Sequence, residues 1–145
     1  MVPKIKTLQF QKAVRPGSKN QQERYFLDFF ISGQSLRSIL ELDKANLITP
    51  FGWAANKEYE RQIIRTFTLR EKSELETGRV MLYVCPECGD IDCGAATAII
   101  KDYGERIIWK DFGYETGYNG VSETYPLIAP IEFERQNYFQ AFSKL

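Results

Sequence analysis

Histidine does not occur in this chain of 145 residues, and its absence removes several kinds of chemistry. Triads that join serine or cysteine to histidine are excluded, as are ordinary histidine acid–base pairs. No glycine-rich segment continues into the Gly-Lys-Ser/Thr sequence of a phosphate-binding loop. Carboxylates two residues apart, such as Glu132 and Glu134, are common on solvated strands and are weak evidence for glycosidase-like chemistry. Catalysis would therefore depend on the cysteines alone.

Long hydrophobic runs are also lacking. No apolar stretch approaches the roughly 20 residues of a membrane span, and the first ten residues mix Lys4 and Lys6 with single apolar residues, unlike a signal peptide. We therefore expect no membrane association, a cytoplasmic location and reduced thiols. Hydrophobic residues make up 43% of the chain and aromatic residues 14%, which excludes disorder. The length and composition predict a single α+β domain over residues 1–145.

The charges balance over the whole chain, but they are distributed unevenly. Residues 1–80 contain 14 Lys/Arg and 9 Asp/Glu, whereas residues 81–134 contain 3 Lys/Arg and 10 Asp/Glu. Tyrosine, tryptophan and phenylalanine are interleaved with the carboxylates of the acidic half. This composition is poor for binding phosphate, so we expect no nucleic-acid partner. It suits a surface that receives a basic protein, because aromatic residues anchor and carboxylates steer. The alternative is a solvated sheet edge with ordinary loops.

Hydrophobic alternation and turn residues predict an antiparallel sheet of about five strands with two or three helices. Strands are expected at residues 6–14, 24–32, 80–84, 95–101 and 106–112. Asp102-Tyr103-Gly104-Glu105 favours a hairpin turn, so residues 80–112 should form a three-stranded meander. Helices are predicted after Ser35 and over residues 134–145, whereas residues 57–70 fit either a helix or a strand. Residues 113–130, with three glycines and two prolines, are predicted to be a long irregular segment.

The only three cysteines fall within nine residues, as Cys85, Cys88 and Cys93 of Cys-Pro-Glu-Cys-Gly-Asp-Ile-Asp-Cys. Zinc takes four ligands, so three thiolates would need a fourth from Asp90, Asp92, water or another chain. Cys-Pro-x-Cys-Gly resembles the knuckle of zinc ribbons, although the second knuckle of a ribbon is missing.

Two other interpretations of the cysteine loop stay open. The thiols can pack as small hydrophobic groups in a turn. Alternatively, Cys85 and Cys88 can form a redox dithiol with Cys93 as the resolving partner. Redox chemistry is the weaker interpretation, because the loop joins two predicted strands and lacks a helix N-terminus that would lower a thiol pKa. We therefore predict no cofactor, with zinc as the alternative.

Two resemblances bear on function. The segment Leu82–Ala95, followed by Trp109–Tyr114, resembles a block found in small uncharacterised bacterial proteins. In size and composition the whole chain is similar to immunity proteins of contact-dependent and polymorphic toxin systems. These are small cytoplasmic single-domain proteins that cap a toxin with an acidic or aromatic face. This second resemblance implies a protein partner and no catalysis.

The hypothesis from the sequence is a non-enzymatic bacterial immunity protein that neutralises a cognate basic toxin, such as a nuclease, by direct binding. The residues expected to bind the toxin are Asp111, Tyr114, Glu115, Tyr118, Glu123 and Tyr125. The alternative is a small zinc-binding or thiol-redox protein that uses Cys85, Cys88 and Cys93.

Overall fold

A computed structural model of the chain describes residues 5–19, 23–42, 47–53, 57–86, 94–117, 120–125 and 128–145, apart from the side chains of Ser122 and Glu123. The strands of this described part are β1 (Ile5–Lys6), β2 (Leu8–Arg15), β3 (Arg24–Ile31), β4 (Gln34–Ser35), β5 (Val80–Val84), β6 (Ala95–Asp102), β7 (Arg106–Thr116), β8 (Gly120–Thr124) and β9 (Ile131–Glu134). Its helices are α1 (Leu36–Ile39), α2 (Lys57–Phe67) and α3 (Arg135–Ser143).

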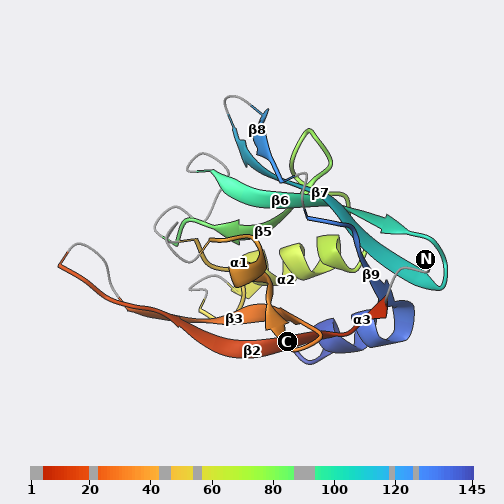
Figure 1. Ribbon diagram of the computed structural model, residues 1–145, viewed down its shortest axis with the longest axis horizontal. Coiled ribbons are helices and arrows are strands. Elements are labelled where there is room, and N and C mark those ends of the chain that lie inside the picture. Colours follow the sequence, from red (N-terminus) through yellow and green to blue (C-terminus); the bar gives the residue numbers. More distant parts are fainter. Residues whose placement is uncertain are drawn as a thin grey trace.

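The strands form two sheets, which confirms the predicted α+β class. The larger sheet has six strands in the order β1-β9-β7-β6-β5, with β8 also paired to β7, and the smaller sheet has the order β2-β3-β4. Every pairing between these strands is antiparallel except that of β1 with β9. In the view of Figure 1 the two sheets lie one above the other, with α2 between them and α3 beside β2 and β9.

The predicted meander of residues 80–112 is confirmed as β5, β6 and β7. β5 is buried along its whole length. The turn between β6 and β7 is closed by the N–H of Tyr103, which donates to the carbonyl of Arg106 at 2.9 Å. Gly104 adopts a φ of 85°, a conformation that glycine takes without strain, and its N–H donates to the Asp102 carboxylate at 2.8 Å.

The helices agree with the sequence patterns and settle the ambiguous segment. Ser35 caps α1, because its hydroxyl accepts the N–H of Ser38 at 3.3 Å. The ambiguous residues form helix α2, which the chain leaves through Leu69 at a φ of 62°. The predicted terminal helix is α3. No helix among the described residues is long and apolar enough to cross a membrane.

The prediction of an irregular segment over residues 113–130 is wrong. β7 continues to Thr116, and β8 pairs with it, so that Gly113 lies opposite both Thr97 and Thr124. The glycine therefore sits inside a strand, where it was expected to break one. The short strand β9 was not predicted either. It lies between β7 and β1 and connects the two ends of the chain.

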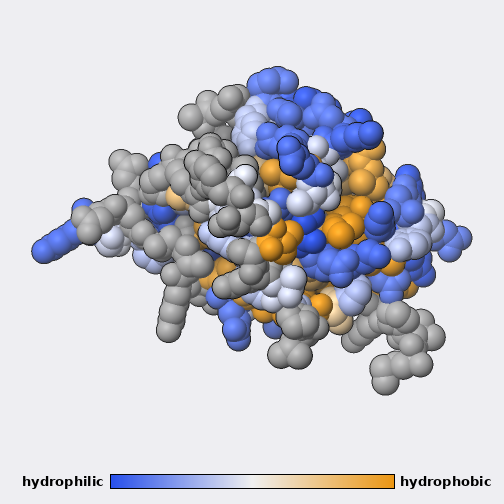
Figure 2. Space-filling model, turned by 90° about the horizontal axis from the view of Figure 1, so that it is seen from above, coloured by the Kyte–Doolittle hydropathy of each residue, from blue (hydrophilic) through white to orange (hydrophobic). Residues whose placement is uncertain are grey.

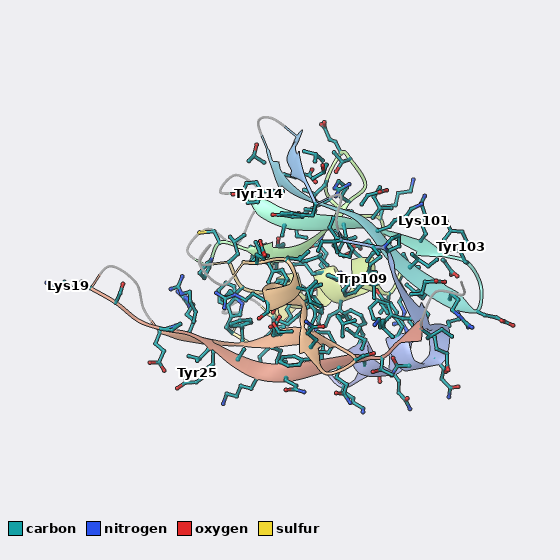
Figure 3. All side chains as sticks on the ribbon, viewed as in Figure 1. Lys19, Tyr25, Lys101, Tyr103, Trp109 and Tyr114 are labelled. Atoms are coloured by element: carbon teal, nitrogen blue, oxygen red, sulfur yellow. The ribbon has the colours of Figure 1, made fainter. Side chains whose placement is uncertain are left out.

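An aromatic core fills the space between the two sheets. Trp109 lies at its centre (Figure 3), with ring contacts to Phe29, Phe67, Phe133 and Tyr138. The Tyr138 hydroxyl accepts the indole N–H of Trp109 at 3.2 Å and donates to the Phe67 carbonyl at 2.6 Å. That carbonyl belongs to the last turn of α2 and has no partner within the helix, so Tyr138 satisfies it.

A short segment without strand structure links the two sheets on one side. Ile48 exchanges two backbone hydrogen bonds with Val84 at the edge of β5, at 3.0 and 2.7 Å. Three residues further on, the Phe51 carbonyl accepts the N–H of Leu27 from β3 at 3.0 Å. The Thr49 hydroxyl donates to the Leu27 carbonyl at 2.6 Å. The free edges of β5 and β3 are thereby both covered.

Candidate functional site

The larger sheet turns one face to the aromatic core and the other face away from it. Because side chains alternate along a strand, the neighbours of Trp109 and Ile107 in β7 point to the face that we call outer. A row of directly paired residues crosses four strands on this face. It consists of Ile5, Glu132, Ile108 and Lys101, and Lys110 and Ile99 form the next pair.

We call these six residues the outer patch. Its members are exposed or half-buried, and Ile5 has a relative exposure of 45%. Tyr103, at the tip of the adjoining β6–β7 hairpin, is 59% exposed. The view from above shows hydrophobic residues at the surface among hydrophilic ones (Figure 2). Aliphatic and aromatic groups next to charges, on a rigid sheet, are the ingredients of a protein-binding surface.

The other part of the outer face is covered. Leu75 packs on Met81, Val84 and Ala95, which form a second, smaller cluster of buried residues. Next to it Arg79, Thr97 and Glu115 make a buried polar network. Arg79 Nε donates to the Thr97 hydroxyl at 2.9 Å and lies 3.6 Å from the Glu115 carboxylate. The Thr77 hydroxyl donates to the same carboxylate at 2.9 Å.

Glu115 is therefore not an exposed partner-binding residue, and that expectation is wrong. Its relative exposure is 3% and that of Arg79 is 7%. Burial lowers the pKa of Arg79, while the charges of Glu115 and Asp111 act in the opposite direction. A carboxylate this deeply buried beside a cation stabilises the native packing, because it neutralises a charge that water cannot reach.

Asp111 keeps an exposed position, at the bulge where β7 departs from regular pairing with β6. Its φ is 54°, in the left-handed region that aspartate tolerates better than most residues. The backbone carbonyl of Asp111 accepts a hydrogen bond from the Arg79 guanidinium. Asp111 thus links the buried network to the surface, and its role in binding a partner stays a prediction.

The predicted tyrosines are less accessible than the sequence suggested. Tyr114 and Tyr125 are half-buried and pack against the aromatic core. Gly94 leaves room for Tyr114, because a Cβ at that position would overlap the phenol hydroxyl. Tyr118 lies outside the described residues. The backbone of Glu123 pairs with Tyr114 in β8, and its side chain is likewise outside them.

The cysteine loop is described only at its first thiol. Cys85 is half-buried and packs against the aromatic core. Cys88 and Cys93, and the proposed fourth ligands Asp90 and Asp92, lie outside the described residues. Within the described ranges no three Cys, Asp or Glu side chains gather as a metal site would require. Zinc stays a prediction, which elemental analysis of freshly reduced protein tests directly.

One buried polar site was missed by the sequence analysis. Asp28, with a relative exposure of 2%, accepts hydrogen bonds from the Tyr83 hydroxyl at 2.5 Å, the Ser35 hydroxyl at 2.6 Å and the Phe29 N–H at 2.9 Å. Burial raises the pKa of Asp28, and the three hydrogen bonds and the charge of Arg37 oppose that rise. Burial also raises the pKa of Tyr83. A single carboxylate inside the aromatic run of residues 24–31 was the available signal.

In Figure 3, Tyr103 at the exposed tip of the β6–β7 hairpin and Tyr114 lie at opposite ends of the larger sheet. Tyr114 therefore does not share a surface with Tyr103. Comparison with known proteins adds no analogue: no protein family, curated protein or solved structure matches the chain significantly.

Proposed function

We propose that this protein is a non-enzymatic binding protein that neutralises a cognate toxin domain, as immunity proteins do, and that the toxin docks on the outer patch. The observation that carries the proposal is the patch itself. Ile5 and Ile108 lie on either side of Glu132 in one row, Ile108 is paired with Lys101, and Ile99 is paired with Lys110 in the next row. The rigid sheet holds these side chains in place before binding, which lowers the entropic cost of association.

The buried ionisable groups also support a binding role. Asp28 and Tyr83 bond to each other inside the main core, and Arg79 and Glu115 pair beneath the outer face. In both networks the polar atoms are engaged in holding strands and loops together. Recognition is then left to the exposed side chains, of which Tyr103 is the largest beside the patch. Tyrosine is enriched at the energetic centres of interfaces.

The charge around the patch favours a basic partner. Glu105, Asp111 and Glu134 are exposed on β7, its turn and β9, and together with Glu132 they outnumber Lys101 and Lys110 of the patch. Carboxylates at the rim of an interface mainly accelerate association, and salt screens this effect over about 8–10 Å. We therefore expect association with the toxin to slow as ionic strength rises.

The experiment is a protection assay in cells that produce the product of a toxin gene neighbouring this one, together with kinetics on the purified complex. Tyr103→Ala and Ile5→Lys should speed dissociation at least tenfold and abolish protection. Tyr25→Ala is the matched control, because Tyr25 is 53% exposed but lies on the smaller sheet. We expect it to leave both readouts unchanged.

The two parts of the proposal fail differently. A chain that gives no protection and forms no complex with the neighbouring gene product is not its immunity protein. If a complex forms and Tyr25→Ala weakens it while Tyr103→Ala does not, the immunity role stands but the outer patch is not the interface. Melting temperatures of all variants should lie close to that of the parent chain, because the substituted side chains are exposed.

A further inference from the structure

Strand β2 forms an edge of the smaller sheet. Its backbone N–H and carbonyl groups point toward β3 at one residue and away from β3 at the next. The Ser32 N–H donates to the Thr7 carbonyl at 2.9 Å, so residues at this position and every second residue after it face β3. The intervening residues, Leu8, Phe10, Lys12 and Val14, face away. The N–H of Leu8 indeed bonds to the Asn137 side chain of α3, at 2.9 Å.

The outer edges of the β2–β3 hairpin differ in whether their backbone groups are hydrogen-bonded. Leu27, which lies opposite Lys12 on β3, has both of its outward backbone groups bonded to residues 49–51. On β2, the outward N–H and carbonyl groups of Phe10, Lys12 and Val14 have no hydrogen-bond partner among the described residues. Three consecutive outward positions are thus open for pairing with another strand.

A hollow lies beside this open edge. A cavity of about 490 Å³ is bounded on one side by Leu8 and Phe10 of β2 and on the other by Ala141 and Lys144 near the end of α3. The edge beyond it belongs to the part of the hairpin that extends away from the body of the molecule, with Lys19 near its tip (Figure 3). An incoming strand could run along β2 and place a side chain in the hollow.

A second copy of this chain is a poor occupant. The symmetric antiparallel register that uses all three open positions places Phe10 opposite Val14 of the other copy and Lys12 opposite Lys12. Directly opposed like charges destabilise a strand pair. The same lysine favours an acidic residue at that position. Lys144, which lines the hollow, adds a second positive charge beside this edge.

We infer that β2 binds an extended acidic segment of another protein by strand addition, with a carboxylate opposite Lys12 and apolar residues opposite Phe10 and Val14. Main-chain hydrogen bonds to the three open positions hold the segment, and the alternating pockets select its side chains. Val14 is 42% exposed and Tyr25, its cross-strand neighbour, is 53% exposed, so an apolar side chain can pack there. This inference does not depend on the proposed immunity function.

The test uses two synthetic peptides of eight residues that alternate valine and threonine and carry either one glutamate or one lysine at the centre. Fluorescence anisotropy should show the glutamate peptide binding at least tenfold more tightly than the lysine peptide. Amide hydrogen exchange should slow at Phe10, Lys12 and Val14 when the glutamate peptide is bound. Equal binding of the two peptides, or unchanged exchange at these three amides, would overturn the inference.

Three variants sharpen the test. Lys12→Glu should reverse the preference between the peptides, whereas Lys19→Glu, the same charge change away from the open edge, should alter binding less than twofold. Val14→Pro removes one outward N–H without touching the ladder to β3, and it should weaken the glutamate peptide at least fivefold. A concentration-dependent dimer in sedimentation that Val14→Pro abolishes would show that the edge serves self-association and would also overturn the inference.

Discussion

Two carboxylates are buried in the described part of the chain, and their surroundings differ: one has neutral donors and the other a cation. Asp28 lies in the main core and is surrounded by neutral donors, the hydroxyls of Tyr83 and Ser35 and the N–H of Phe29. Glu115 lies on the outer face of the larger sheet and has the Arg79 guanidinium 3.6 Å away. The pKa of Asp28 is raised by its burial, and that of Arg79 is lowered by its own burial.

The difference shows that burial alone does not determine the protonation state of a carboxylate. Hydrogen bonds from neutral donors let Asp28 exist with or without its proton, at a moderate cost in either form. Glu115 and Arg79 depend on each other, because removing either charge leaves the other buried without compensation. Asp28 is therefore a site at which pH acts on this fold, and we expect substitution to act most strongly at the Arg79–Glu115 pair.

The largest expected effect follows from breaking the ion pair. Glu115→Ala should lower the free energy of unfolding by about 3–5 kcal/mol, because the Arg79 cation is left buried without its partner. Urea denaturation measures the loss. Glu132→Ala, a half-exposed glutamate on the same face, is the control and should cost less than about 1 kcal/mol. A loss as small as that of the control would show that water reaches Arg79.

The ion pair can also be replaced as a unit. The double variant Arg79→Met with Glu115→Leu should recover most of the stability lost in Glu115→Ala, since well-packed apolar residues often substitute for a buried pair at little cost. If the double variant is no more stable than the single one, the hydrogen bonds of Arg79 to Thr97 and Asp111 matter more than its charge.

An intermediate effect is expected at the other carboxylate. Asp28→Ala should lower the free energy of unfolding by about 2–3 kcal/mol, because the Tyr83 hydroxyl and the Phe29 N–H lose their acceptor inside the core. Thermal and urea unfolding give the value. The comparison between the two networks breaks down if Asp28→Ala costs more than Glu115→Ala, for Asp28 would then be an essential charge as well.

A smaller effect is expected when one donor is removed and the carboxylate is kept. Tyr83→Phe should cost about 1–1.5 kcal/mol, the usual net contribution of a buried hydrogen bond. It should also raise the pKa of Asp28 further, because the Tyr83 hydrogen bond favours the ionised form. Carboxyl titration followed by NMR detects this shift, and a lowered pKa in the variant would contradict the assignment.

The pH dependence should be the smallest effect and the most diagnostic. Since the pKa of Asp28 is raised in the native state, the proton binds more tightly there than in the unfolded chain. Its stabilising contribution is full below the unfolded value of about 3.9 and is lost as pH rises through the native pKa. The stability of the parent chain relative to Asp28→Asn should therefore fall as pH rises from about 4. Urea titrations over a pH series measure the difference, and a rise would contradict it.

Local sequence patterns predicted much of the fold. The alternating run of residues 80–84, the turn at residues 102–105 and the aromatic spacing of residues 134–145 each specify one element through contacts close in sequence, and each is observed. The segment of residues 57–70 stayed ambiguous because its apolar residues fit both periods. Packing of Ile63 and Phe67 into the aromatic core favours the helix. Gly113 was misread because its place inside β7 depends on strands on both sides of it.

The candidate site was harder to predict than the elements that carry it. Asp111, Tyr114, Glu115 and Tyr125 were chosen for their residue types, and residue type does not determine exposure. Glu115 is buried because Arg79 reaches it from the end of a distant loop, and Tyr114 is held against the core where Gly94 leaves space for it. The outer patch escaped the sequence analysis, because its row needs β9 to lie between β1 and β7.

The sequence by itself determined the α+β class, the meander of β5, β6 and β7, and the lack of any histidine-based chemistry. These follow from short-range periodicity and from composition. The tertiary structure alone decided that β1 pairs in parallel with β9, that the edge of β3 is covered while that of β2 stays open, and that Glu115 faces Arg79. Such pairings join residues far apart in the chain, so they are selected by competition among many possible partners during packing, which no local pattern records.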